Sequence, residues 1–164
     1  MEIWDLVDAD GRPAGVKYDR GSGAPIPQGL CFKVVEVWLR VVDKILITQR
    51  HPDKWAGLKW EVSGGGVLSG EGEADAARRE MREETGIDLP PSSVTLMGVT
   101  SSPPAVIYSY FAALEDYPGV TPQPEEVVGY KFVTRDELYG MADELTNGSR
   151  ERLIKYTDKI FNLG

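Results

Sequence analysis

The chain has 164 residues, of which 41% are hydrophobic and 27% charged, a composition typical of a soluble globular protein with room for a folded core. The formal net charge of −8 argues against nonspecific binding to nucleic acid, because that binding needs a basic surface. Cys31 is the only cysteine in the sequence, which excludes an internal disulfide and a thiolate metal cluster.

The sequence contains no long apolar segment and no signal peptide, and its opening residues alternate and are acidic. We therefore expect a cytoplasmic protein without a membrane or nucleic acid partner. It also has no internal repeat and no linker long enough to divide it, so we expect one domain over residues 1–164. A monomer and a homodimer are both compatible with the sequence.

The first elements predict an N-terminal hairpin, at about residues 1–29. Residues 2–8 alternate between apolar and polar side chains, as a half-buried strand does. Asp10 and Gly11 signal a turn, after which residues 15–18 are expected to return as a short partner strand. Residues 20–29 are rich in glycine and proline, which predicts a loop that covers one face of the domain.

Three strands are predicted before the middle of the chain. Residues 30–42 are apolar and rich in β-branched side chains, which predicts a central strand, and residues 45–50 return after a tight turn at residues 43–44. A loop over residues 51–59 follows and begins with the only histidine, which we expect to be a loop residue and not a metal ligand. Residues 60–62 form a short strand that leads into a run of glycines.

Residues 63–87 are the most informative stretch of the chain. They begin with the glycine run at residues 64–66, and from about Glu73 they predict one helix that ends at Gly86, which we expect in the left-handed conformation. At about 3.6 residues per turn, three carboxylates fall on one side of this helix. They are Glu80, Glu83 and Glu84.

The other sides of this helix predict how it packs. An apolar stripe of Ala74, Ala77 and Met81 is expected to be buried against the sheet, while Arg78 and Arg82 point the opposite way and are expected to be exposed. The crowded glutamates repel one another, and the C-terminal end of a helix already carries partial negative charge. Carboxylates gathered at this place favour a hard divalent cation such as Mg²⁺, which prefers oxygen ligands.

The remaining elements are three strands and two helices. The strands are expected at residues 94–100, 106–114 and 125–133. Residues 134–137 form a capping box that opens a helix to about residue 142. A last amphipathic helix is expected over residues 150–161, after a break at residues 147–149, with Leu153, Ile154, Ile160 and Phe161 as its core anchors.

The spacing of the fixed residues in the glutamate helix resembles the Nudix box in every fixed position. The pattern is G-x5-E-x7-R-E-M-x-E-E-x-G-I, on Gly65, Glu71, Arg79, Glu80, Met81, Glu83, Glu84, Gly86 and Ile87. The resemblance implies an α/β/α sandwich with a mixed β-sheet, which agrees with the order of the predicted elements. The opening residues also look like the N-terminal hairpin of isomerase-like Nudix members.

The Nudix resemblance implies hydrolysis of a diphosphate linkage in a nucleoside diphosphate or related nucleotide derivative, a small phosphorylated substrate. It also implies Mg²⁺ as cofactor, with Mn²⁺ as an alternative, since bound divalent ions neutralise a diphosphate and lower the pKa of bound water. By family role, Glu80 and Glu84 are the principal metal ligands. Glu83 shares the metals or orients a bound water, and Arg79 positions these carboxylates.

Further candidates lie outside the glutamate helix. Gly65 and Gly66 let the backbone approach the helix and the phosphates closely. Glu125 or Glu126 is the candidate for the distal carboxylate that the family often adds, and the alternative is a solvated strand end. Arg50 is a candidate phosphate contact or an exposed arginine. Three aromatic residues are candidates for stacking on a base, and the alternative is that they belong to the core. They are Tyr108, Tyr110 and Phe132.

Two other functions are weighed against hydrolysis. An isopentenyl-diphosphate-isomerase-like enzyme would use a cysteine just before the box, where this chain has none and Cys31 lies about thirty residues upstream. A noncatalytic nucleotide-sensing domain would have no need of the complete set of glutamates. Hydrolysis is therefore the preferred interpretation.

Overall fold

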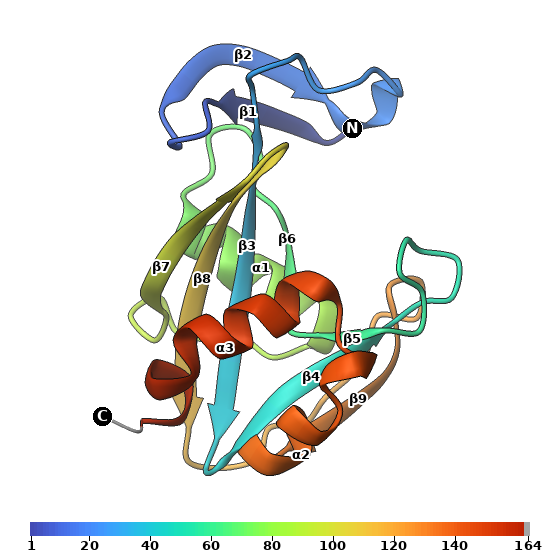
Figure 1. Ribbon diagram of the computed structural model, residues 1–164, viewed down its shortest axis with the longest axis vertical. Coiled ribbons are helices and arrows are strands. Elements are labelled where there is room, and N and C mark those ends of the chain that lie inside the picture. Colours follow the sequence, from blue (N-terminus) through green and yellow to red (C-terminus); the bar gives the residue numbers. More distant parts are fainter. Residues whose placement is uncertain (163–164) are drawn as a thin grey trace.

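The computed structural model describes residues 1–162 and contains nine strands and three α-helices (Figure 1). The strands are β1 (Ile3–Val7), β2 (Pro13–Asp19), β3 (Phe32–Val41), β4 (Lys44–Arg50), β5 (Trp60–Glu61), β6 (Ser63–Gly66), β7 (Thr95–Ser102), β8 (Ala105–Leu114) and β9 (Val127–Val133). The helices are α1 (Glu73–Thr85), α2 (Arg135–Gly140) and α3 (Asn147–Phe161). Across residues 1–162, no helix has both the length and the apolar character to cross a membrane.

A seven-stranded mixed sheet forms the centre of the molecule. Five of its strands run in the order β5-β4-β3-β8-β7, while β6 pairs with β3 and β9 pairs with β4. The central pair β3 and β8 is parallel over residues 32–41 and 105–114, and the other pairs are antiparallel. The predicted α/β class with a mixed sheet is confirmed.

Helices cover both faces of this sheet (Figure 1). Alternate residues of β3, such as Val35 and Val37, pack with Ala77 and Met81 of α1 in one apolar cluster. Trp38 points to the opposite face, where it joins Leu153 and other apolar residues of α3. Because successive side chains of a strand point to opposite faces, the apolar residues of β3 contribute to a hydrophobic core on each face of the sheet.

The sheet divides at one end, and this division makes room for a cavity. Strands β3 and β4 are paired only through residues 40–41 and 44–45, and beyond these residues they diverge (Figure 1). The glycine strand β6 continues the β3 side, at residues 63–66. Strands β5 and β9 continue the β4 side. The carboxylate-bearing helix α1 contacts β3 and β6 behind the opening.

The N-terminal hairpin β1–β2 is fastened directly to the loop that precedes α1. The Ser69 backbone N–H donates to the Ile3 carbonyl at 2.7 Å. The Asp5 carboxylate accepts hydrogen bonds from the Ser69 hydroxyl at 2.8 Å and from the Gly70 N–H at 2.9 Å. Lys17 of β2 donates to Asp5 as well, at 2.9 Å. The hairpin is therefore docked onto the glutamate motif.

Several sequence predictions about packing are wrong in detail. Arg78 is not exposed, because its side chain lies along α1 and donates to the Leu89 carbonyl at 2.8 Å. Ala76 is fully buried, whereas Ala74 is only partly buried. The buried face of α1 is therefore rotated slightly from the predicted face, toward Ala76. Arg82 is exposed and Met81 is buried, as predicted.

The last helix and the glycine run also differ from the predictions. Helix α3 begins at Asn147, where a break was predicted, because the Thr146 hydroxyl caps it by accepting from the Ser149 N–H. Ile154 is 63% exposed and is not a core anchor, whereas Leu153 and Ile160 are fully buried. The glycine run belongs to the strand β6, which was not predicted from the sequence.

Candidate active site

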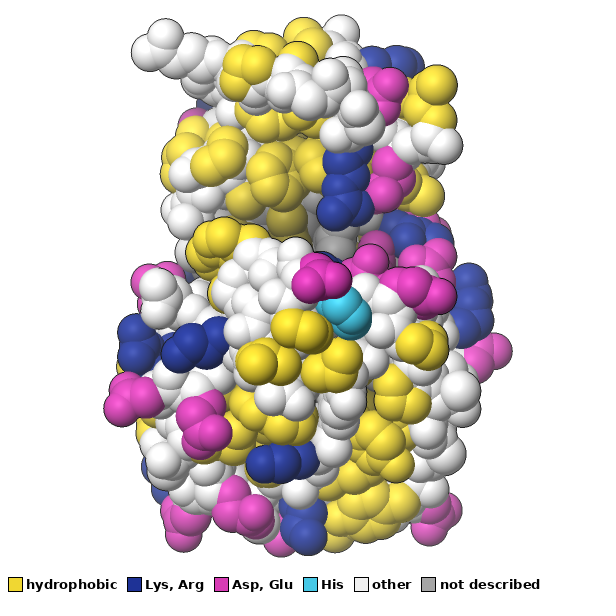
Figure 2. All heavy atoms as spheres, turned by 90° about the vertical axis from the view of Figure 1, so that its right-hand side faces the viewer, with side chains coloured by type: hydrophobic (Ala, Val, Ile, Leu, Met, Phe, Trp, Pro, Cys, Tyr) yellow, Lys and Arg dark blue, Asp and Glu magenta, His cyan; other side chains and the backbone are white. Residues whose placement is uncertain are grey.

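A cavity of about 540 Å³ lies where the sheet divides, between the N-terminal hairpin and the body of the molecule (Figure 2). Its walls come from β3, β6, α1, the hairpin, and the segments around residues 50–54 and 123–126. Eight of the residues that the sequence singled out as site candidates line this cavity. They are Arg50, Gly65, Gly66, Arg79, Glu80, Glu83, Glu84 and Glu126.

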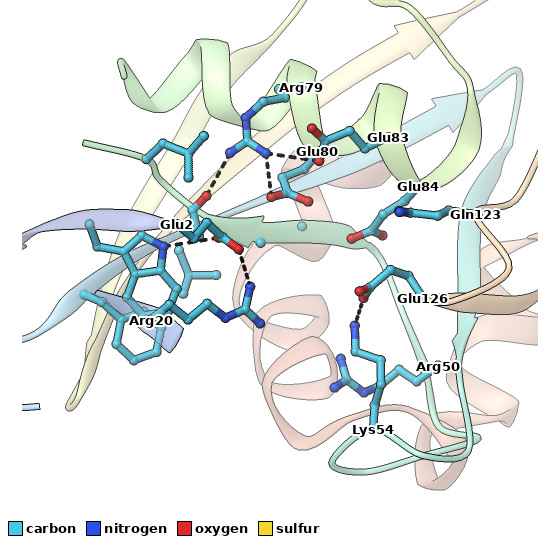
Figure 3. Close-up of a pocket in the computed structure, with 17 residues that line it drawn as sticks. Glu2, Arg20, Arg50, Lys54, Arg79, Glu80, Glu83, Glu84, Gln123 and Glu126 are labelled. Atoms are coloured by element: carbon cyan, nitrogen blue, oxygen red, sulfur yellow. Dashed lines mark hydrogen bonds and ion pairs between the residues drawn. The ribbon is translucent and has the colours of Figure 1, made fainter. Parts of the chain in front are cut away.

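Arg79 holds one wall of the cavity together (Figure 3). Its guanidinium donates to both oxygens of Glu71 at 2.7 and 3.0 Å, to Glu80 at 3.0 Å and to Glu83 at 3.1 Å. It also donates to the Gly66 carbonyl at 3.0 Å, which joins α1 to β6. With five donors in a rigid fork, arginine suits this bridging of several carboxylates.

Burial and mutual repulsion disfavour the charged forms of two of the glutamates. Burial raises the pKa of Glu80 to about 7, although the adjacent Arg79 opposes the shift. Burial also raises the pKa of Glu84 well above its ordinary value, and the negative charges of Glu61 and Glu80 add to the effect. Glu71 behaves differently, since its hydrogen bonds from Arg79 and the Leu68 N–H outweigh burial and lower its pKa.

The glycines of β6 allow two close approaches. A Cβ at Gly65 would collide with the carboxyl group of Glu80, so this glycine lets the carboxylate lie against the strand backbone. A Cβ at Gly66 would lie 2.8 Å from the indole nitrogen of Trp4, so the second glycine accommodates the hairpin. Any larger side chain at either position would have to displace a neighbouring side chain, which is why glycine is required at both positions.

Basic residues stand across the cavity from α1 (Figure 3). Lys54 forms an ion pair with Glu126, which lines the cavity, whereas Glu125 is exposed and does not line it. Arg50 donates through one nitrogen to both oxygens of Glu61, at 2.7 and 2.9 Å. Burial raises the pKa of Glu61 even though Arg50 opposes the shift. Two cations therefore lie close to the acidic wall.

The hairpin supplies a wall that the sequence predictions missed. Glu2, Trp4 and Arg20 line the cavity together with Phe32 of β3. The alternation of β1 places Glu2 and Trp4 on one side of the strand, but their position over the cavity depends on where the hairpin docks. That docking rests on contacts across more than sixty residues, such as the one between Asp5 and Gly70, for which the sequence has no local signal.

The chemistry of the acidic wall fits a hard divalent cation. The donors are carboxylate oxygens, and over residues 1–162 the Glu84 carboxylate has no hydrogen-bond or ion-pair partner although the residue is 8% exposed. A buried carboxylate without a partner is costly, and a cation would remove that cost. Within the same residues, no three metal-ligating side chains converge as they stand. Glu80 and Glu83 are instead held by Arg79.

The other candidate residues lie away from the cavity. Tyr110 belongs to the core beside α1, and Tyr108 and Phe132 pack against that core, so none of the three lines the cavity. Cys31 is buried in a separate apolar cluster with Val7 and does not line the cavity either. The cysteine is therefore not placed for chemistry at the glutamates.

Comparisons with known proteins agree with this arrangement. A family model described as NUDIX domain matches residues 33–156. An uncharacterized Nudix hydrolase of Listeria monocytogenes is 29% identical, over 99% of this chain and 95% of that protein. Nudix hydrolase 3 of Arabidopsis thaliana is 33% identical over 94 residues, which cover 54% of this chain and 12% of that protein.

Solved structures share the fold at low sequence identity. The crystal structure of DR0079 from Deinococcus radiodurans has a TM-score of 0.79 and 22% identity, and the match covers 94% of this chain and 98% of that one. A bifunctional NMN adenylyltransferase/ADP ribose pyrophosphatase of Francisella tularensis, complexed with AMP and a Mn ion, has a TM-score of 0.71 and 18% identity. That match covers 84% of this chain and 43% of the other.

Proposed function

Because the chain belongs to the Nudix hydrolase family, we propose that it hydrolyses the diphosphate linkage of a nucleoside diphosphate or a related nucleotide derivative. Mg²⁺ is the proposed cofactor, with Mn²⁺ as the alternative. One observation carries the proposal: the family's glutamates line a cavity of about 540 Å³, a size that suits a small organic ligand, and two cations face them.

The glutamate wall would hold the metal. Glu80 and Glu84 are the proposed principal ligands, and Glu83 shares the metal or orients a water. The buried, unpaired carboxylate of Glu84 supports this role, as does the Mn ion in the Francisella structure. Arg79 acts as a positioning residue, since its contacts to Glu80 and Glu83 fix their side chains. When bound, the metal supplies charge neutralisation and a more acidic water.

The remaining polar residues bind the phosphates and move the proton. Arg50 and Lys54 are proposed to contact the phosphate oxygens of the substrate. Lys54 is paired with Glu126 before substrate binds, and the charge of a diphosphate competes for this lysine. Glu126 then accepts a proton from the attacking water. The water oxygen bonds to one phosphorus, and the bridging oxygen leaves with the other phosphate.

The two alternative functions receive less support from the site. Isomerase-like chemistry would need a thiol at the glutamates, and Cys31 is 1% exposed in a separate apolar cluster with Val7 and Val106. A noncatalytic sensor has no need of a metal site, so it would not account for the cluster of buried carboxylates. The mutual repulsion of these carboxylates lowers the stability of the fold. Hydrolysis is the function for which each of these groups has a use.

A substrate panel with matched variants tests the proposal. Nucleoside diphosphates and sugar nucleotides are incubated with Mg²⁺ or with EDTA, and product release is measured. Glu126→Gln removes the proposed base and should lower kcat by at least about a hundredfold, a range typical of general base catalysis. Glu84→Gln removes a proposed metal ligand and should also abolish most of the Mg²⁺-dependent activity, whereas Glu125→Gln, an exposed neighbour, should do neither. Absence of Mg²⁺-dependent hydrolysis for every substrate, or full activity of Glu84→Gln, would contradict the proposal.

Melting curves test the metal site without turnover. Mg²⁺ that binds only the folded protein should raise the Tm of the parent by mass action. Glu84→Gln removes a buried charge, so its Tm in EDTA should equal or exceed that of the parent, and it should gain less from Mg²⁺. If Mg²⁺ leaves the Tm of the parent unchanged, the metal assignment is wrong.

A further inference from the structure

The hairpin end of the cavity carries an arginine and a carboxylate held side by side (Figure 3). Arg20 donates to the Glu2 carboxylate at 2.9 Å, and its backbone N–H donates to the Glu2 carbonyl at 3.0 Å. The Arg20 guanidinium also lies 5.5 Å from the ring centre of Trp4. Both side chains stay accessible, at 58% and 37% exposure, so they are fixed and still free to contact a ligand.

Beside this pair the cavity has an apolar surface of fixed shape. The ring of Trp4 stacks on Phe32 at 4.7 Å between ring centres with an angle of 19°, and its edge lies against Gly66. Phe32, Val34 and Leu68 are half-buried and line the cavity. Because Trp4 stacks on Phe32 and restricts its motion, the Phe32 side chain loses little conformational entropy when a ligand packs against this surface.

We propose that this end of the cavity binds the nucleobase of the substrate, with Arg20 donating to the polar edge of the base and Glu2 accepting from it. The inference rests on the proposed function and deepens it. Every nucleobase has flat apolar faces and an edge on which an N–H donor stands next to an acceptor. Phe32 matches the face, and the Arg20–Glu2 pair offers the complementary donor and acceptor.

Other ligand groups match this wall less well. A sugar carries several hydroxyl groups around the rim of its ring, and the single Arg20–Glu2 pair would leave some of them unpaired, which is costly. An isoprenoid chain would cover the Arg20–Glu2 pair without hydrogen-bonding to it, so it would bear the cost of desolvating both charges. A phosphate would be repelled by Glu2, whereas Arg50 and Lys54 offer cations at the other end of the same cavity.

Variants of the hairpin test the inference. Arg20→Ala removes the donor, and Glu2→Gln keeps the size of the side chain while changing its charge. Arg12→Ala is the matched control, because Arg12 lies on the same hairpin, pairs with Asp10 and does not line the cavity. Each protein is assayed with a nucleoside diphosphate and with methyl diphosphate, which has no base. Binding of nucleoside monophosphates is measured by calorimetry in EDTA.

The inference predicts a loss that is specific to the base. Arg20→Ala should lower the ratio of kcat/KM for the nucleoside diphosphate to kcat/KM for methyl diphosphate by about tenfold, or roughly 1.4 kcal/mol, mainly through KM. Nucleoside monophosphates should bind Arg20→Ala about tenfold and Glu2→Gln about threefold more weakly, and Arg12→Ala should match the parent. Circular dichroism and the Tm verify that each variant is folded.

Two results would overturn the inference. An equal loss for methyl diphosphate and the nucleotide would mean that Arg20 contacts phosphate, and identical behaviour of Arg20→Ala and Arg12→Ala would mean that it contacts nothing in the substrate. If the parent hydrolyses no nucleoside diphosphate, the proposed function fails on its own. In that case the binding of nucleoside monophosphates still tests whether the hairpin recognises the base, because this measurement requires neither turnover nor metal.

Discussion

Glu80 links the stability of the metal-free protein to pH. Burial raises its pKa from 4.5 to about 7, so the folded state holds a proton that the unfolded state releases above pH 4.5. The stabilising contribution is complete below pH 4.5 and is lost as the pH rises through 7. We expect the unfolding free energy in EDTA to fall by on the order of 3 kcal/mol over this range because of this residue.

Urea unfolding of the parent and Glu80→Gln between pH 4.5 and 7.5 measures this effect. The glutamine cannot ionise, so the slope of stability against pH should be smaller in the variant. Glu125→Gln is the control, since Glu125 is exposed and lies outside the cavity. Equal slopes for the parent and Glu80→Gln would show that burial does not govern this carboxyl group.

At the scale of single residues, helical periodicity placed most side chains of α1 correctly. It predicted that Glu80, Glu83 and Glu84 share one side, and all three line the cavity. It was wrong for Arg78, because the Leu89 carbonyl that the side chain reaches belongs to a later segment that folds back over the helix. Long side chains find such distant partners, which a local pattern does not contain.

The turn between β3 and β4 contains a strained residue. Val42 has a φ of +58°, in the left-handed region that β-branched residues avoid, and it is 59% exposed. Hairpin turns of two residues require a positive φ at this place, and glycine meets the requirement without strain. The sequence prediction put the turn one residue later, since Asp43 and Lys44 have better turn chemistry than valine.

Val42→Gly should therefore stabilise the protein. Relief of strain, about 1–3 kcal/mol, exceeds the extra flexibility of glycine in the unfolded chain, about 0.5–1 kcal/mol. A net gain of about 1 kcal/mol corresponds to a rise in Tm of roughly 2–4 °C for a protein of this size. Calorimetry measures the shift. Val42→Ala keeps the Cβ atom and should gain less, and a lower Tm for Val42→Gly would refute the assignment of strain.

The β1–β2 hairpin depends on one carboxylate for its attachment. Hydrogen bonds from Lys17, Ser69 and the Gly70 N–H lower the pKa of Asp5 to about 2. A depressed pKa means that the attachment is strong above pH 4 and weakens as the pH falls toward 2. Asp5→Asn should reproduce the weakened attachment at neutral pH.

Hydrogen exchange resolves this effect by element. In Asp5→Asn the amides of β1 and β2 should exchange faster at pH 7, while those of β3 and β8 keep the protection of the parent. Asp10→Asn, an exposed substitution on the same hairpin, serves as control. Uniformly faster exchange throughout the sheet would mean that the hairpin does not open separately.

At the scale of elements, the sequence predicted nearly every strand and helix, because the apolar residues of most of them recur with a clear period. The capping box of Thr134 and Glu137 is present at the start of α2. The strand β6 was missed because glycine has a low propensity for strands, and its four pairings with β3 come from tertiary structure. Its lack of side chains is what lets Glu80 and Trp4 approach.

Across the whole molecule, one buried ion pair joins the last helix to the central strand. Glu36 of β3 accepts from Arg152 of α3 at 2.7 Å, and also from Trp38 and Ser109 at 2.8 Å each. The Glu36 and Arg152 side chains are 6% and 13% exposed. The sequence predictions passed over this pair, because the two residues lie 116 positions apart.

Removing one partner of this pair should be costly. Arg152→Ala leaves the Glu36 charge buried without its cation, and such changes cost about 3–5 kcal/mol. Chemical denaturation measures the loss, and Arg150→Ala, on the same helix but 40% exposed, should cost less than about 1 kcal/mol. A loss for Arg152→Ala no greater than that of the control would mean that the pair does not hold α3 to the sheet.

The parallel pairing of β3 with β8 has a consequence for how the chain is made. Each residue of β3 pairs with one 73 positions later, and β3 has only short pairings with β4 and β6 before that partner exists. At about 5–20 residues per second, a ribosome needs roughly 4–15 s to synthesise the intervening segment. During that time the long, largely apolar strand β3 of the nascent protein has an unpaired edge. Slower translation would lengthen this exposure, and chaperones that shield apolar segments would act on β3 first.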